Sequence, residues 1–420
     1  MSASDQERIA ARPAASGPTP RDERIEGLDL LRGFAVLGIL AMNIQSFAMV
    51  DPTYFNPAVS GDFTGVNFAV WLVSHVFADM KFITIFSMLF GAGIVFLCMR
   101  AERRGEPPAR VLRRRTVWLL VFGLAHAYLF WTGDILVWYS FSGTLAYLFW
   151  RLRPGRLVAW GLFLLAVGTG VYLFFQWSLP YWPPEAVANN RMWWDPPPEV
   201  VAARLDAYRG GWLEQMQERI PGALAMQTFV YLIFGLWRTL GPMLLGMAFL
   251  KWGIVSGQRT TRFYTTMAVG GAACGVPLVV SGLFWNLSHG WAWASSMYGG
   301  SLFNYWGSLF IASAYIALVM LAWQGGWMKG AQRLLAPVGR MAFTSYILQT
   351  IVCTTIFYGH GLGLYGSTPR WGQALVVAGV WGLIIVVANW WLAHYRFGPL
   401  EWLWRSLTYR SRQPMRLETA

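Results

Sequence analysis

A histidine and an aspartate could do acid–base chemistry near the end of an apolar segment. His126 lies within the run TVWLLVFGLAHAYLFWTGDILVWYS, and Asp134 follows it by eight residues, just after Gly133. A neutral histidine can take a proton from a hydroxyl or an amine when a carboxylate orients its ring. If the chain folds back at the glycine, the two side chains approach each other. We interpret His126 as a candidate catalytic base and Asp134 as its partner; the alternative is a buried histidine with a structural role.

Three further polar residues share one face of the segment LDLLRGFAVLGILAMN. Asp29 and Arg32 are three residues apart, so on a helix they can form an ion pair. Asn43 lies eleven residues beyond Arg32, about 16 Å further along a helix and on nearly the same face. We expect the first two to bind an anionic substrate group and Asn43 to orient reacting groups. The alternatives are a structural ion pair and an interhelical hydrogen bond.

Other ionisable residues lie within or beside apolar segments. Arg238 precedes Gly241-Pro242 in the run 224–250, where a kink would free backbone carbonyls. An arginine in such a segment needs an anionic ligand or a carboxylate partner, so we interpret it as substrate-binding. His360, in FYGHGLGLYG, is the next candidate after His126, for substrate binding or as a base. His75 ranks after it.

Motifs for other chemistry are missing from the sequence. The three cysteines, Cys98, Cys274 and Cys353, form no C-x-x-C pair, so neither a zinc site nor a disulfide framework is indicated. There is no G-x-S-x-G, Walker A or H-E-x-x-H motif. The sequence therefore predicts no metal and no bound cofactor.

The composition defines the elements that must position these residues. Of 420 residues, 56% are hydrophobic and only 13% are charged, whereas soluble domains have about 25% charged residues. Apolar runs of about twenty residues, long enough to cross a bilayer, recur along the chain. We therefore predict an all-α, polytopic membrane bundle of about ten transmembrane helices and exclude a soluble enzyme. The predicted spans are 28–50, 82–99, 116–132, 135–150, 157–177, 224–250, 262–284, 302–324, 341–358 and 372–392.

The net charge of +13 comes from arginines between the apolar runs, which indicates membrane topology rather than nucleic-acid binding. The arginine-rich segments 100–115, 151–156, 251–262 and 329–340 predict cytoplasmic loops, and both termini then lie in the cytoplasm. We divide the chain into three parts: a disordered tail at 1–24, a transmembrane domain at 25–392 and a basic cytoplasmic tail at 393–420. Within the domain we expect a short outer helix at 66–80 and an outer amphipathic segment at 178–223, interrupted near Gly210-Gly211.

Several motifs spread over the chain resemble the YeiB-like bacterial membrane proteins, the family of domain of unknown function 418. The resemblance implies a multi-pass protein of the bacterial cytoplasmic (inner) membrane. The motifs are LDLLRGFAVLGILAMNI (Leu28–Ile44), KFITIFSMLFGAG (Lys81–Gly93), GLAHAYLFWTGDIL (Gly123–Leu136), GRMAFTSYILQT (Gly339–Thr350), FYGHGLGLYG (Phe357–Gly366) and YRFGPLEWLWRSLTY (Tyr395–Tyr409).

The N-terminal half is also similar to transmembrane acyltransferases such as the lysosomal heparan glucosaminide N-acetyltransferase. That resemblance implies acyl transfer from a cytoplasmic acyl-CoA to an acceptor on the far side of the membrane. In those enzymes an asparagine in the first span, which Asn43 matches, precedes a catalytic histidine in the next outer loop. Residues 51–66 contain no histidine here, and Tyr54 stands at the corresponding spacing.

These observations lead us to expect a membrane-embedded acyltransferase. Arg32 and Arg113–Arg115 would hold the phosphates of the acyl-CoA donor, Asn43 would orient the reacting groups, and His126 with Asp134 would deprotonate a glycan or small-molecule acceptor. The expected partners are membrane lipids, the donor, the acceptor and a second copy of the chain in a homodimer. A transporter or exporter of an amphipathic metabolite and a non-catalytic lipid-binding protein remain alternatives.

Overall fold

The computed structural model describes residues 26–417, which form helices joined by short turns. Within these residues no strand forms beyond a single bridge between Tyr395 and Arg416. The all-α membrane fold predicted from composition is confirmed. The tail predicted at 1–24 lies outside the described residues.

Seven helical stretches in the described part of the chain are long and apolar enough to cross a membrane. Two shorter apolar helices, Leu136–Phe149 and Ala342–Phe357, lie among them, and α5 (Pro108–Leu129) begins with arginines. The total of about ten spans stays a prediction. The seven stretches are Glu26–Ala48, Gly65–Arg103, Pro154–Tyr181, Met216–Lys251, Thr261–Ser288, Trp293–Gln324 and Arg370–His394.

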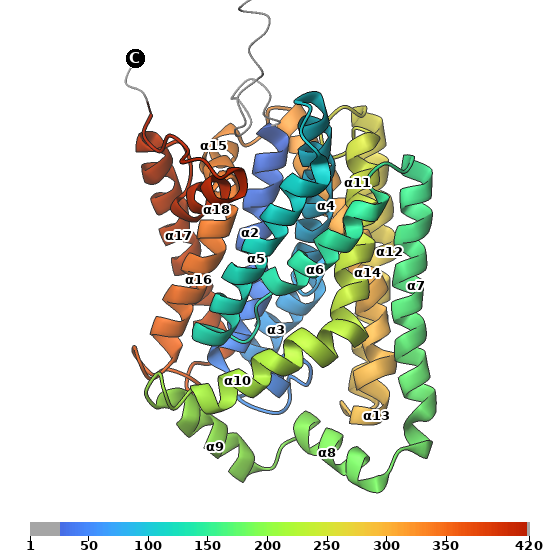
Figure 1. Cartoon of the computed structure of the whole chain (residues 1–420). Helices are drawn as coiled ribbons and strands as arrows, with labels where there is room; N and C mark the ends of the chain where they lie inside the picture. The colour runs from blue at the N-terminus through green and yellow to red at the C-terminus, as the bar shows by residue number, and fades with distance from the viewer. Residues whose placement is uncertain (1–25, 418–420) are drawn as a thin grey trace, which may run out of the picture.

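Some of these stretches contain more than one helix, and each predicted span overlaps at least one helix (Figure 1). The helices are α2 (Glu26–Ala48), α3 (Gly65–Phe77), α4 (Lys81–Arg103), α5, α6 (Leu136–Ala146), α7 (Pro154–Ser178), α8 (Pro184–Trp194), α9 (Pro198–Arg209), α10 (Met216–Ala225), α11 (Leu236–Lys251), α12 (Thr261–Ser288), α13 (Trp293–Ser295), α14 (Ser301–Gln324), α15 (Lys329–Arg340), α16 (Ala342–Phe357), α17 (Arg370–His394) and α18 (Pro399–Tyr409).

Segments of 3-10 or π-helix, three to ten residues long and here called irregular turns, connect some of these helices. A π-helix lies between α10 and α11, and α11 then continues through Pro242. The irregular turns are η1 (Asp51–Tyr54), η2 (Tyr147–Phe149), η3 (Leu179–Tyr181), η4 (Met226–Gly235) and η5 (Ser296–Gly300).

Helix α2 runs through the middle of the bundle and packs on α4, α14, α15, α16 and α17 (Figure 1). Glycines allow the closest approaches. A Cβ atom on Gly339 of α15 would clash with the Asp29 carbonyl of α2, and one on Gly246 of α11 would clash with the Met88 carbonyl of α4. Small residues at such contacts let helix backbones approach within a membrane bundle. These contacts fix α2, α4 and α11, which carry most of the candidate site residues.

The bundle has two different ends (Figure 1). One end, which we call the arginine-rich end, holds α15, α18 and the α4–α5 turn, and the helices flanking 151–156 and 251–262 also end there. The opposite end, the α8–α10 end, is covered by α8, α9 and α10. The predicted amphipathic segment 178–223 contains α8, α9 and most of α10, which ends at Ala225. Helix α9 ends at Arg209, next to the predicted break.

Two segments differ in detail from the sequence-based picture. The short outer helix predicted at 66–80 is α3, and a turn at residues 78–80 with a left-handed Met80 (φ 63°) separates it from α4. The segment after His394, predicted as a basic tail, contains α18, which packs against α5 and α16. Burial of Trp404 holds this helix on the bundle.

Candidate functional site

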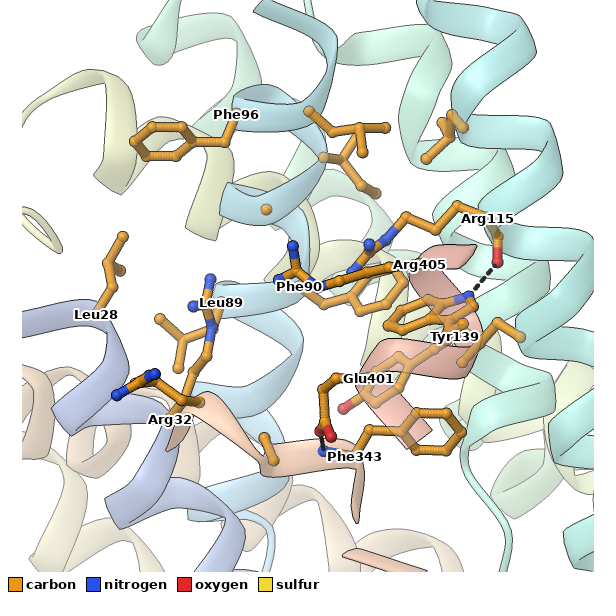
Figure 2. A pocket seen from close by; sticks show the side chains of 18 of the residues that line it. Leu28, Arg32, Leu89, Phe90, Phe96, Arg115, Tyr139, Phe343, Glu401 and Arg405 are labelled. Carbon is orange, nitrogen blue, oxygen red and sulfur yellow. Dashed lines mark hydrogen bonds between the residues drawn. The ribbon is translucent and has the colours of Figure 1, made fainter. Parts of the chain in front are cut away.

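A cavity of about 300 Å³ opens at the arginine-rich end, among α2, α4, α5, α16 and α18. Its lining includes eight arginines but only three carboxylates, Asp29, Glu106 and Glu401. Figure 2 shows Arg32, Arg115 and Arg405, which come from three different helices, among the side chains that line this space. Guanidinium groups bind phosphate through paired hydrogen bonds. The arginines are Arg32, Arg100, Arg103, Arg104, Arg115, Arg340, Arg396 and Arg405.

The inner part of the cavity is apolar and aromatic. The side chains there come from α2, α4, α5, α6 and α16, and two tyrosine hydroxyls are among their few polar groups. A cavity that is cationic at its mouth and apolar inside fits an amphipathic anion. The inner residues include Val36, Ile39, Phe86, Phe90, Ile94, Leu119, Ile135, Tyr139, Phe343 and Tyr346.

Two of the three carboxylates, Asp29 and Glu401, accept hydrogen bonds from other groups of the protein. Asp29 accepts a hydrogen bond from Arg32 Nη1 at 2.9 Å, so the ion pair predicted from their spacing is present. Glu401 accepts from the backbone N–H groups of Phe343 and Thr344, at 2.7 and 3.0 Å. Burial raises the pKa of Glu401, and these hydrogen bonds act in the opposite direction. The mouth of the cavity therefore keeps an excess of positive charge.

Only part of the predicted Arg113–Arg115 cluster faces this cavity. Arg115 lines it and its guanidinium stacks 3.7 Å from the Trp404 ring of α18. Arg113 is exposed, and neither it nor Arg114 lines the cavity. Successive residues point about 100° apart around a helix. Consequently, three consecutive arginines cannot all face one site.

His126 and Asp134 come together, as do His126 and Thr350 of α16. His126 Nδ1 lies 2.7 Å from Asp134 Oδ1, and Nε2 lies 2.9 Å from Thr350 Oγ1. Asp134 Oδ2 also accepts from the Val137 N–H at 2.9 Å, which closes the turn between α5 and α6. Because a carboxylate only accepts, Nδ1 carries the hydrogen and Nε2 accepts from the threonine.

This group lies behind the cavity wall rather than in it. His126, Asp134 and Thr350 are at most 2% exposed, and none of them lines the cavity. The nearest connection is Tyr346, whose ring centroid lies 5.2 Å from that of His126 and which does line the cavity. Both ring nitrogens of His126 are occupied in this conformation.

The structure does not join Asn43 or His360 to these residues. Asn43 is half-buried on α2, beyond Ile39, the last α2 residue that lines the cavity. His360 lies at the α8–α10 end, where its Nδ1 is 3.3 Å from Gln215 Oε1. Burial and the nearby Arg219 lower the pKa of His360. Among the described residues, no hydrogen bond or ion pair therefore joins Arg32, Asn43 and His126 to one another, although the sequence predicted roles in acyl transfer for all three.

Arg238 is buried at 2% exposure on α11. Its Nη2 donates to Thr84 Oγ1 at 2.7 Å and to Ser308 Oγ, and the guanidinium lies 5.3 Å from the centre of the Tyr305 ring. Nε and Nη1 have no hydrogen-bond partner within the described residues. Buried polar groups are nearly always paired, so these two N–H groups mark a place for an oxygen ligand.

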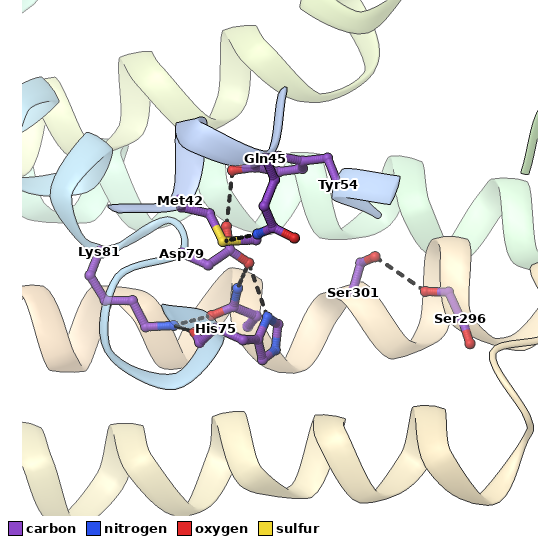
Figure 3. Close-up of polar contacts among 9 residues, drawn as sticks. Met42, Gln45, Tyr54, His75, Asp79, Lys81, Ser296 and Ser301 are labelled. Atoms are coloured by element: carbon purple, nitrogen blue, oxygen red, sulfur yellow. Dashed lines mark hydrogen bonds and ion pairs between the residues drawn. The ribbon is translucent and has the colours of Figure 1, made fainter. Parts of the chain in front are cut away.

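A second polar cluster, which we call the Asp79 cluster, was largely missed from the sequence (Figure 3). It consists of Tyr54, His75, Asp79, Lys81 and Asn304. Asp79 accepts from the Tyr54 hydroxyl at 3.1 Å and from Asn304 Nδ2 at 2.7 Å, and its Oδ2 lies 3.2 Å from His75 Nδ1. Lys81 Nζ donates to Asn304 Oδ1 at 2.7 Å. The signal in the sequence was SHVFADMK, three ionisable residues within one apolar stretch.

The cavity and the Asp79 cluster are close along α4. Phe86, which lines the inner cavity, is five residues from Lys81, a rise of about 7.5 Å. Arg238 hydrogen-bonds Thr84 between them, and Ser87 Oγ lies 2.9 Å from the hydroxyl of the cavity residue Tyr139. Polar side chains of α4, Thr84 and Ser87, therefore lie between the cluster and the inner end of the cavity.

A bundle of apolar helices with an arginine-lined internal cavity and buried ionisable groups defines a membrane protein. The chain is 32% identical to the uncharacterized protein YeiB of Escherichia coli (strain K12) over 396 residues, covering 93% of this chain and 98% of YeiB. It is 31% identical to the uncharacterized protein YxaH of Bacillus subtilis (strain 168), covering 96% and 98%. Residues 249–411 match the family described as protein of unknown function (DUF418). The chain belongs to this YeiB-like family. No solved structure matches it.

Proposed function

We propose that the protein is a membrane-embedded acyltransferase whose donor is a cytoplasmic acyl-CoA bound in the arginine cavity. The observation that carries this proposal is the polarity of the cavity, with eight arginines at the mouth and an apolar, tyrosine-bearing inner end. Coenzyme A has the matching polarity, because its phosphates lie at one end and its thioester lies at the other. The nucleotide would stay at the open mouth while the acyl group enters the apolar part.

Transfer requires a nucleophile and a base. A hydroxyl or amine of an acceptor attacks the thioester carbonyl carbon, the C–S bond breaks, and a base takes the proton of the nucleophile. His126, held by Asp134, is the base predicted from the sequence, and that assignment stays a prediction. To act, its Nε2 would have to exchange the Thr350 hydroxyl for the acceptor.

Binding of coenzyme A to the purified protein tests the donor site. Arg32→Gln and Arg115→Gln should each weaken binding about tenfold or more, because a hydrogen bond to a charged group contributes about 1.5–3 kcal/mol. Arg113→Gln removes a neighbouring, exposed arginine of the same helix that does not line the cavity. It should leave the affinity within about twofold. Titration calorimetry in detergent measures all three, and absence of binding to the wild-type protein would refute the donor assignment.

A transporter of an amphipathic anion is the second candidate. It is favoured by one observation: Nε and Nη1 of Arg238 lack a hydrogen-bond partner within the described residues, and this arginine lies beyond a cavity that opens at one end. Proteoliposomes distinguish the two functions. Movement of intact acyl-CoA or of another amphipathic anion, without release of thiol, would favour transport, whereas thiol release that depends on the protein would favour acyl transfer.

The acyltransferase proposal also includes a homodimer, membrane lipids as partners and a location in the bacterial inner membrane. The bacterial origin of the relatives supports the proposed location.

A further inference from the structure

Among the described residues, His126 and His75 each pair with an aspartate, and the two pairs differ at the second ring nitrogen, Nε2. In both pairs a carboxylate faces Nδ1 of the imidazole, at 2.7 Å for His126 and 3.2 Å for His75. Thr350 occupies Nε2 of His126. By contrast, no residue in the described part of the chain hydrogen-bonds Nε2 of His75. A general base needs a free lone pair, and of these two described histidines His75 has one in this conformation, whereas His126 does not.

The surroundings of Asp79 set the tautomer of His75. Tyr54 and Asn304 both donate to the Asp79 carboxylate, which therefore acts as an acceptor on both oxygens. The third donor must be Nδ1–H of the imidazole, so that the lone pair lies on Nε2. The ring also stacks on Trp71, with centroids 4.9 Å apart and planes 10° apart, which fixes its orientation.

Lys81 and Asn304 keep this arrangement in place. Lys81 is fully buried and donates to the His75 carbonyl as well as to Asn304 Oδ1, each at 2.7 Å. The turn at residues 78–80 separates α3 from α4, with the left-handed Met80 at the start of α4, and Asp79 and Lys81 on either side of Met80 are both buried. In membrane proteins, backbone groups freed at such breaks commonly line ligand sites.

Arg238 provides the complementary charge. Its Nη2 donates to Thr84, which lies three residues after Lys81 on α4. Its Nε and Nη1 have no hydrogen-bond partner within the described residues. Lys81 and Arg238 together outnumber the one carboxylate of the cluster, Asp79. A buried, fixed cation with free donors stabilises a carbonyl oxygen as it becomes an oxyanion.

We infer that the Asp79 cluster and Arg238 form the acceptor half of the transferase site. His75 Nε2 takes the proton from an acceptor hydroxyl or amine that approaches from the α8–α10 end. Arg238 binds the thioester oxygen, the new C–O or C–N bond forms, and the C–S bond breaks. The thiolate leaves with the electron pair of the C–S bond and takes up a proton from water at the open mouth of the cavity, while His75 passes the proton that it took from the acceptor to solvent. This inference depends on the proposed function and deepens it.

The test uses the full-length protein in proteoliposomes, with acetyl-CoA as the donor. Water serves as the acceptor in one assay and ethanolamine, added on the side of the α8–α10 end, in the other. His75→Gln should lower both rates about 100-fold or more, and Asp79→Asn should lower them less. The affinity for coenzyme A should stay within about twofold of wild type, because neither residue lines the cavity.

His126→Gln is the matched comparison. If it abolishes transfer while His75→Gln keeps a rate within about threefold of wild type, the inference is wrong and the acyltransferase proposal stands with His126 as the base. If the wild-type protein binds coenzyme A but releases no thiol, both are wrong. If coenzyme A does not bind, the donor assignment itself is wrong, and the inference falls with it.

Chemical labelling provides a second measurement that does not depend on turnover. Diethyl pyrocarbonate reacts with an unoccupied imidazole nitrogen, and peptide mass spectrometry reports each histidine separately. His75 should react about tenfold faster than His126 in the same wild-type sample, because Thr350 and Asp134 occupy both nitrogens of His126. Equal rates, or faster reaction at His126, would overturn the assignment of a free Nε2 on His75.

Discussion

Replacing Glu401 should loosen both the fold and the cavity. Its carboxylate accepts from the backbone N–H groups of Phe343 and Thr344, which lie in the first turn of α16, and from the Thr344 hydroxyl at 2.6 Å. A carboxylate at this position satisfies N–H groups that have no partner within the helix and interacts favourably with the helix dipole. Glu401 therefore caps α16 from a different helix, α18.

The magnitude follows from these three hydrogen bonds. At about 1 kcal/mol net each, with a further penalty of about 1 kcal/mol for the buried Phe343 N–H left unpaired, Glu401→Ala should lower the stability by about 4 kcal/mol. Glu401→Gln keeps one acceptor oxygen and should lose about half of that. The same change should weaken coenzyme A binding, because α18 also carries the cavity arginine Arg405.

Thermal unfolding of the purified protein in detergent measures the first effect and calorimetry the second. The matched control is Glu102→Ala, which removes an exposed ion pair with Arg151 at the same end of the bundle. Exposed pairs contribute at most about 1 kcal/mol. An unfolding midpoint for Glu401→Ala equal to that of the control would refute the capping argument.

Two further predictions concern packing and pH. Gly246→Ala should lower the unfolding midpoint because its Cβ would clash with the Met88 carbonyl, whereas Gly93→Ala on α4 faces open space and should leave the midpoint unchanged. Burial raises the pKa of Asp51 to about 6 from 3.8, so the folded state binds this proton more tightly than the unfolded chain, and stability falls as the pH rises through this interval. Asp51→Asn should therefore be more stable than wild type at neutral pH, with the difference disappearing below about pH 4; a difference that does not change with pH would contradict the raised pKa.

Apolar length was sufficient to predict the helices of the fold, because crossing a bilayer requires about twenty apolar residues whatever the tertiary structure is. The same criterion could not predict the role of α18. The arginines of the segment after His394 indicate a solvated tail, and the docking of Trp404 against α5 makes α18 part of the bundle. The position of a short helix of this kind depends on contacts with distant segments.

The contacts of the candidate site were likewise predictable from the sequence only in part. The ion pair of Asp29 with Arg32 follows from spacing along one helix, which a sequence shows directly. The Asp79 cluster depends on Asn304, which lies 223 residues after Lys81 and bridges it to the carboxylate. No pattern within the SHVFADMK segment identifies that partner. Likewise, the loss of a free nitrogen on His126 depends on Thr350, 224 residues away.

The contribution of α18 to the cavity has a consequence for biosynthesis. Glu401, Trp404 and Arg405 of α18 close the mouth, whereas α2, α4 and α5, which form much of the wall, are made more than 250 residues earlier. A ribosome-bound chain that has already inserted these three helices still has an incomplete pocket. Ligand loading would then begin only after α18 has been made, and a nascent chain that stalls before α18 would present an open, cationic funnel to the aqueous phase.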